Sequence, residues 1–183
     1  MKNKLLHPRQ IITLRDYPVH NEHILKIYFR IFMKNQGKIL PPCPVMHKFS
    51  GIPYAKGKDF KSVRYNKLLK KFFEEHPRAE YFLIDGSHKT TAATLAHKLI
   101  PVVIIEKDKD FKKAKELIKV GEFFGWYLVE NSMKESFNVL AKHYFSTKEF
   151  LTVEEKTEKM IKNKVVPEYM GTFFKNKFDR THI

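Results

Sequence analysis

Residues 81–98 read YFLIDGSHKTTAATLAHK, and this stretch decides the fold. Its first four residues, Tyr81–Ile84, form an apolar run that predicts a buried strand. An Asp-Gly pair stops that strand, and residues 90–98 then predict a helix. The next apolar run, Pro101–Glu106, is rich in β-branched residues and predicts a second strand. Strands that alternate with helices in this way predict an α/β or α+β protein with a small mixed sheet.

The segment before this stretch adds another strand and helix. Apolar residues 11–14 predict a short strand that ends before Pro18. In residues 22–33 the apolar positions recur every three or four residues, which predicts an amphipathic helix. Asn21 is the candidate N-cap of that helix and Gly37 its candidate stop.

An unusual group of prolines follows. Three prolines among residues 41–44 exclude a helix, so residues 39–46 are predicted to be extended at a sheet edge. Residues 47–65 are basic and irregular, and we expect a surface loop or hairpin insertion there. Leucine and phenylalanine pairs then predict a short helix over 66–76, which Pro77 ends.

The C-terminal part of the chain is predicted to be helical. Helices are expected at roughly 111–120, 133–145 and 152–164, and the segment after Pro167 is expected to be a loosely packed tail. These patterns predict two units. Residues 1–108, with the basic insertion 47–65, are expected to form one domain, and residues 109–183 are expected to form a helical subdomain.

The composition is that of a globular protein. The 183 residues are 43 % hydrophobic and 14 % aromatic, which is enough for one full core. The longest apolar run, Leu99–Ile105, is much shorter than the roughly 20 residues that span a bilayer. The single cysteine, Cys43, excludes an internal disulfide and is expected to be a packed small residue. We therefore expect a soluble, cytoplasmic protein without a membrane partner.

The net charge of +15 favours an anionic partner. Residues 1–80 hold 17 Lys and Arg against 6 Asp and Glu, so the excess lies in the N-terminal half. Aromatic residues are interleaved with cations in this region, a pattern that suits single-stranded nucleic acid, a lid over a nucleotide, or a solvated loop. The candidate nucleic-acid contacts are Lys56, Lys58, Lys61 and Arg64.

The junction at residues 85–91 carries the densest group of polar side chains. Unpaired N–H groups and the positive end of the dipole make the first turn of a helix a good phosphate site. Gly86 permits a tight turn and a close approach of the ligand. Asp85 would repel a phosphate, but it suits Mg²⁺. The candidate phosphate ligands are Gly86, Ser87, His88, Lys89, Thr90 and Thr91.

The same polar residues also suit a simpler role. Asp85 or Ser87 can act as an N-cap of a helix whose first turn is exposed. Neither the phosphate-loop motif G-x-x-x-x-G-K-[ST] nor the dinucleotide fingerprint G-x-G-x-x-G occurs in the chain. Spacing alone leaves both interpretations open.

The stretch LIDGSHKTTAATL, followed by IPVVII, resembles the ParB/sulfiredoxin superfamily. In that superfamily a strand leads into a glycine-centred motif, an alanine-rich helix and a strand that begins Ile-Pro. The resemblance covers residues 10–106, except the insertion 47–65, and implies the superfamily's fold. Its opening helix and its Pro-Pro-x-x-Val strand are matched by Pro18, Glu22, residues 22–33, Gly37, Pro41 and Pro42.

The motif separates the activities within the superfamily. Sulfiredoxins carry a catalytic cysteine after the glycine, where this chain has Ser87. Chromosome-partition ParB proteins carry Gly-Glu-Arg-Arg, and both arginines are missing here. The free-serine kinases carry an Asp-Gly-His-His-Arg type of motif, which is closest to residues 85–89. Lys89 in place of arginine keeps the cation but loses its bidentate geometry.

The resemblance implies a function for the junction. Residues 86–90 would hold the phosphates of ATP or ADP, and Asp85 would support Mg²⁺. Glu22, an acid at the start of the first helix, would orient or deprotonate the attacking hydroxyl. Our first hypothesis is a nucleotide-dependent phosphotransferase or hydrolase with Glu22 and Asp85 as catalytic residues. The alternatives are a ParB-like protein or nuclease that acts on DNA or RNA, and a scaffold that has lost its chemistry. Homo-oligomers are compatible with each.

Overall fold

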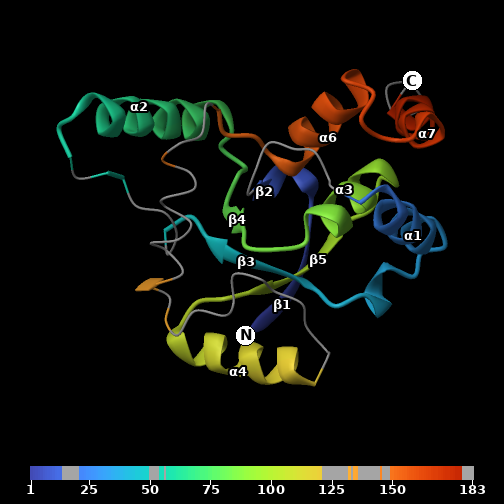
Figure 1. Cartoon of the computed structure of the whole chain (residues 1–183), viewed down its shortest axis with the longest axis horizontal. Coiled ribbons are helices and arrows are strands. Elements are labelled where there is room, and N and C mark those ends of the chain that lie inside the picture. The colour runs from blue at the N-terminus through green and yellow to red at the C-terminus, as the bar shows by residue number, and fades with distance from the viewer. Residues whose placement is uncertain are drawn as a thin grey trace.

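The computed structural model describes residues 1–13, 21–49, 54–55, 57–120, 132, 134–135, 145 and 149–178. In this part of the chain, five strands form one mixed sheet, and helices surround it (Figure 1). The strands are β1 (Lys2–Leu6), β2 (Ile11–Ile12), β3 (Cys43–His47), β4 (Tyr81–Leu83) and β5 (Ile100–Ile104). The helices are α1 (Glu22–Met33), α2 (Phe60–Glu75), α3 (Ser87–Leu95), α4 (Asp108–Lys119), α6 (Val153–Lys162) and α7 (Glu168–Phe178), with short 3-10 turns η1 (Pro8–Gln10) and η2 (Gly37–Ile39). The predicted mixed α/β class is confirmed.

The sheet has the order β1-β5-β3-β4-β2. β1 pairs antiparallel with β5, and β5 pairs parallel with β3 through Cys43 and Val102. β3 pairs antiparallel with β4, and β4 pairs parallel with β2. β3 and β4 are almost entirely buried, as expected of central strands rich in apolar residues. The segment 39–46 was predicted to lie at an edge, and the structure instead places β3 in the middle of the sheet.

Most elements lie where the sequence predicts them. α1 begins after Asn21, whose side-chain oxygen accepts the Ile24 N–H at 3.1 Å. β4, β5, α4 and α6 match their predicted ranges to within a few residues. The strand β1 was not predicted, because four of its five residues are exposed and no apolar alternation marks it.

Three boundaries were wrong. α2 begins at Phe60, because the Asp59 carboxylate accepts the N–H groups of Lys61 and Ser62 and caps the helix; the predicted insertion is therefore partly helical. α3 spans Ser87–Leu95, and not residues 90–98, so the polar junction is itself the first turn. The predicted loose tail after Pro167 is the helix α7, and Met170 and Phe174 on it are buried. The helix predicted at 133–145 lies almost wholly outside the described residues.

α3 lies at the centre of a helical layer. It packs against α1, α6 and α7, which Figure 1 shows grouped on one side of the sheet. The residues of α6 and α7 share one buried cluster with the strands. The predicted boundary at residue 108 remains a prediction. Among the described helices, none is both long enough and apolar enough to cross a membrane.

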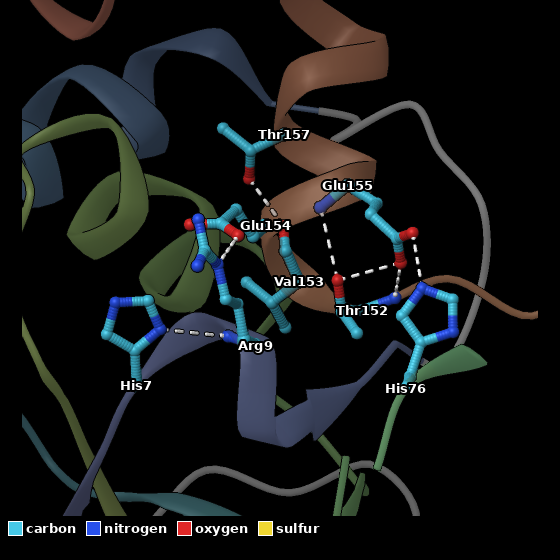
Figure 2. Close-up of polar contacts among 8 residues, drawn as sticks. All are labelled: His7, Arg9, His76, Thr152, Val153, Glu154, Glu155 and Thr157. Carbon is cyan, nitrogen blue, oxygen red and sulfur yellow. Dashed lines mark hydrogen bonds and ion pairs between the residues drawn. The ribbon is translucent and has the colours of Figure 1, made fainter. Parts of the chain in front are cut away.

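A group of polar contacts fixes the start of α6 to the N-terminal core (Figure 2). Thr152 and Glu155 form a capping box, and Glu155 also accepts from the ring of His76 at 2.7 Å. Arg9 of η1, whose backbone N–H donates to the ring of the N-cap residue His7, forms an ion pair with Glu154. Burial acts to raise the pKa of Glu155, but the bonds from Thr152 and His76 outweigh it and lower that pKa. This group therefore stabilises the docking of α6 at neutral pH.

Candidate functional site at the start of α1 and α3

The turn between β4 and α3 requires a glycine at position 86. The backbone of Gly86 has φ of 105°, a left-handed conformation that other residues rarely adopt. A Cβ atom there would also lie only 2.7 Å from the Sγ atom of Cys43 on β3. The glycine is thus explained by the backbone and by packing against the core, whether or not a ligand approaches it.

The first turn of α3 has no side-chain cap. The N-cap position is Gly86, which has no side chain to accept from the N–H groups of the turn. The first backbone hydrogen bond of α3 is made by the Thr90 N–H, which donates to the Gly86 carbonyl at 2.9 Å. Neither Asp85 nor Ser87 therefore acts as the N-cap of α3 in the way that the simpler interpretation required.

The start of α1 meets the start of α3. The backbone N–H of Asn21 donates to the Nε2 atom of His88 at 3.1 Å. Because α1 and α3 pack side by side, the positive ends of two helix dipoles lie next to each other at this contact. The Glu22 carboxylate is exposed and pairs with Lys26 one turn further along α1. The bond from Lys26 lowers the pKa of Glu22, which therefore stays a carboxylate at neutral pH.

Asp85 lies half-buried just before this turn. Burial raises its pKa, although the Gly86 N–H and the charge of Lys89 act in the opposite direction. Burial also raises the pKa of Tyr28, and the nearby Asp85 carboxylate adds to that effect. Cys43 is fully buried, and its pKa is raised to about 11, so its thiol is packed and protonated as expected from the sequence.

Lys89, Thr90 and Thr91 face the protein. The Lys89 ammonium donates to the Pro41 carbonyl at 2.6 Å, and the residue is only 7 % exposed. The Thr90 hydroxyl donates to the carbonyls of Gly86 and Ser87, both at 3.1 Å. Within the described chain the buried Thr91 hydroxyl has no hydrogen-bond partner. These side chains hold the turn in place, and Lys89 contributes its charge from behind the first turn of α3.

The structure brings some predicted site residues together and separates others. Residues 85–91 run through the turn after β4 and into α3, and the contact between Asn21 and His88 brings the start of α1, where Glu22 lies, to the start of α3. Lys58, Lys61 and Arg64 belong to α2 and its approach, on another part of the molecule, and Lys56 lies outside the described residues. Sequence reasoning missed Tyr28 and Pro41 as neighbours of the site. In the sequence, the pair of adjacent prolines, Pro41 and Pro42, was the only feature that singled out Pro41.

A metal ion bound where α1 and α3 begin would need ligands from a bound molecule as well as from the protein. Among the residues that the structure describes, no three His, Cys, Asp or Glu side chains are grouped closely enough to hold a metal. Mg²⁺ is commonly bound by one or two carboxylates together with substrate phosphates and water. The single carboxylate of Asp85 is compatible with that mode of binding and not with a protein-only cage.

No family model, no curated protein and no solved structure matches this chain.

Proposed function

We propose that this protein binds the phosphate groups of a nucleotide, ATP or ADP, where α1 and α3 begin. The observation that carries this proposal is the contact of two helix N-termini through Asn21 and His88, beside a first turn that has no side-chain cap. Backbone N–H groups and the dipoles of both helices favour an anion at such a point. The resemblance of residues 85–89 to the motif of the free-serine kinases, from which Ser87 and Lys89 depart, supports the same assignment.

The groups proposed to hold the phosphates are chosen from the residues at the start of α3 and from the bonds that these residues already make. The N–H groups of the first turn of α3, the Ser87 hydroxyl and the His88 ring are proposed as the direct donors. Lys89 would act through its charge, since its ammonium is bound to the Pro41 carbonyl. The Thr90 hydroxyl and the buried Thr91 shape the turn. Mg²⁺, when bound with the nucleotide at Asp85, would neutralise charge on the phosphates.

The two acids have different proposed roles. Glu22 is exposed and keeps its charge at neutral pH, so it can orient an attacking hydroxyl or water by accepting its proton in a hydrogen bond; the ion pair with Lys26, which lowers the pKa of Glu22, makes deprotonation the weaker part of the proposed role. Asp85 is held partly away from water with a raised pKa, so a nearby cation would favour its charged form. This division of roles is that of a phosphotransferase or a nucleotide hydrolase.

A thermal-shift panel tests the proposal. Wild type is compared with Ser87→Asp, using ATP, ADP, CTP and GTP with and without Mg²⁺. A nucleotide at 100 times its Kd should stabilise the folded wild type by about 2.7 kcal/mol. Ser87→Asp should lose this shift, because it places an acid where the phosphate binds. The variant itself should fold, since an acid in the first turn of a helix is stabilising by about 0.3–1 kcal/mol.

Thr172→Asp is the matched control. It makes the same change of charge at an exposed position on α7, away from the proposed site. The control should keep the Mg²⁺-dependent shift of the wild type. If no nucleotide shifts the wild type, or if both variants lose the shift equally, the site assignment fails.

A further inference from the structure

α2 carries its cations in two groups of different character. Near its C-terminal end, Lys70 pairs with Glu74 at 3.8 Å and Lys71 pairs with Glu75 at 3.6 Å. The group near the N-terminal end comprises Lys58, Lys61, Arg64 and Lys67. Lys58, Lys61 and Lys67 are exposed, and within the described chain none of the three forms an ion pair. Lys58, Lys61 and Lys67 thus differ from Lys70 and Lys71, because only the latter two form ion pairs among the residues that the structure describes.

Asp59, which lies between Lys58 and Lys61 in the sequence, is engaged in capping α2. The Asp59 carboxylate accepts the N–H groups of Lys61 and Ser62 and also the Ser62 hydroxyl. These bonds hold the pKa of Asp59 below its usual range and commit the carboxylate to capping α2. Lys58 and Lys61 lie at the start of α2 and are repelled by the positive end of its dipole, so their placement is unfavourable until an anion is added.

The chain just before α2 folds back on the helix and presents aromatic rings. The Asn66 side chain makes two bonds to the backbone of Ala55, at 2.8 and 2.9 Å. Gly57 lies so close to Ser62 that a Cβ atom would be 2.5 Å from the Ser62 hydroxyl oxygen. These contacts hold Tyr54, which is 51 % exposed, beside the helix, and Phe60 at the first position of α2 is 82 % exposed.

We propose that the N-terminal half of α2 and residues 54–60, except residue 56, form a binding surface for single-stranded nucleic acid. Unneutralised lysines can contact phosphates, and exposed aromatic rings stack on unpaired bases. Phe60 and Tyr54 are available for stacking because the protein leaves their rings exposed. A duplex would use the lysines but not the rings, since its bases are already paired and stacked. The surface lies on α2 and is independent of the nucleotide site proposed at α1 and α3.

The lysines are tested with two double variants of the same helix. A fluorescent 20-mer of thymidine is titrated with protein across a range of salt concentrations. Lys61→Ala with Lys67→Ala should weaken binding and reduce the slope of log K against log salt by about 1.4, since each phosphate contact on a single strand contributes about 0.7. Lys70→Ala with Lys71→Ala makes the same change of charge but removes lysines that are already paired. This control should bind like the wild type.

The aromatic contact is tested with Phe60→Ala. This variant should weaken binding of the thymidine 20-mer about 5-fold or more, the effect of losing one stacked base, and leave binding to a 20-base-pair duplex unchanged. Because Phe60 is exposed, the variant should fold normally, and a melting curve checks this. All of these variants should keep the nucleotide-dependent thermal shift.

Three results would overturn the proposal. One is absence of binding to the thymidine 20-mer at low salt. Another is an equal loss in the two lysine double variants, which would mean attraction by net charge alone. The third is a pair of results: Phe60→Ala binds the 20-mer as the wild type does, and the protein binds vesicles of anionic lipid in a salt-sensitive way that depends on Lys61 and Lys67. This pair would assign the surface to a membrane.

Discussion

Replacing Gly86 by alanine tests the packing of the turn that shapes the site. The substitution places an L-residue at φ of 105°, and a left-handed conformation costs roughly 1–2 kcal/mol per residue. It also places a Cβ atom 2.7 Å from the Cys43 Sγ atom, and overpacking of a core costs about 1–3 kcal/mol. Reduced entropy of the unfolded chain returns less than about 1 kcal/mol. We therefore expect Gly86→Ala to lower the free energy of unfolding by roughly 2–4 kcal/mol.

A double-mutant cycle with Cys43→Ala separates the two costs. Cys43→Ala alone removes one buried atom and should cost about 1 kcal/mol. In the double variant the Sγ atom is gone, so only the backbone strain of Gly86→Ala remains. The loss should then be smaller than the sum of the two single losses by about 1–3 kcal/mol.

Urea unfolding of the four proteins measures this coupling. Cys43→Ser is the control, because it keeps an atom at the γ position and should rescue Gly86→Ala less well than Cys43→Ala does. Additive losses, equal within about 0.5 kcal/mol, would refute the argument that Gly86 is packed against Cys43.

Three further substitutions test other parts of the structure, each by urea unfolding. Burial raises the pKa of Asp85, so the stability that its proton contributes is present below the unfolded pKa and is lost as pH rises through the folded pKa. Asp85→Asn should therefore be more stable than wild type at neutral pH. A difference in unfolding free energy between the two proteins that stays constant across the acid range would contradict this. Thr152→Ala removes the side-chain half of the capping box of α6 and should cost about 1 kcal/mol at neutral pH. Because Glu155 then loses a bond that lowers its pKa, part of this cost should disappear as the pH falls through the folded pKa of Glu155, and a difference from wild type that stays constant on acidification would contradict this. Phe174→Ala should cost about 3–5 kcal/mol because Phe174 on α7 is part of the core. As a control, Phe60→Ala at an exposed position should change stability by less than about 0.5 kcal/mol. Equal effects of the two substitutions would show that α7 is a loose tail.

The elements that the sequence predicted well are those with a strong local signal. Residues 22–33 repeat apolar positions at helical spacing, and Tyr81–Leu83 and Ile100–Ile104 are apolar runs bounded by turn residues. β1 has no such signal, because an edge strand with exposed side chains needs no alternation. α7 contains Gly171 and several aromatic residues, which have low helix propensity, and burial of Met170 and Phe174 stabilises it instead.

The position of the candidate site was predictable, but its internal contacts were not. A strand followed by Asp-Gly and a helix localises the polar junction from the sequence alone, but only the structure shows that the first turn of α3 has no side-chain cap. The sequence gives no sign that Lys89 donates to the carbonyl of Pro41, 48 residues earlier in the chain. Nor does it show that His88 meets Asn21, because that contact depends on how α1 packs against α3. Long-range contacts of this kind are set by tertiary packing.

The central claim is that phosphate binds where α1 and α3 begin. The most direct measurement is an amide NMR titration of the ¹⁵N-labelled full chain with ATP and Mg²⁺, and with inorganic phosphate in parallel. The account predicts that the largest shift changes occur at the amides of residues 21–24 and 85–89, and that they are absent in Ser87→Asp. Changes confined to α2, or no changes at residues 85–89 at millimolar nucleotide, would contradict it.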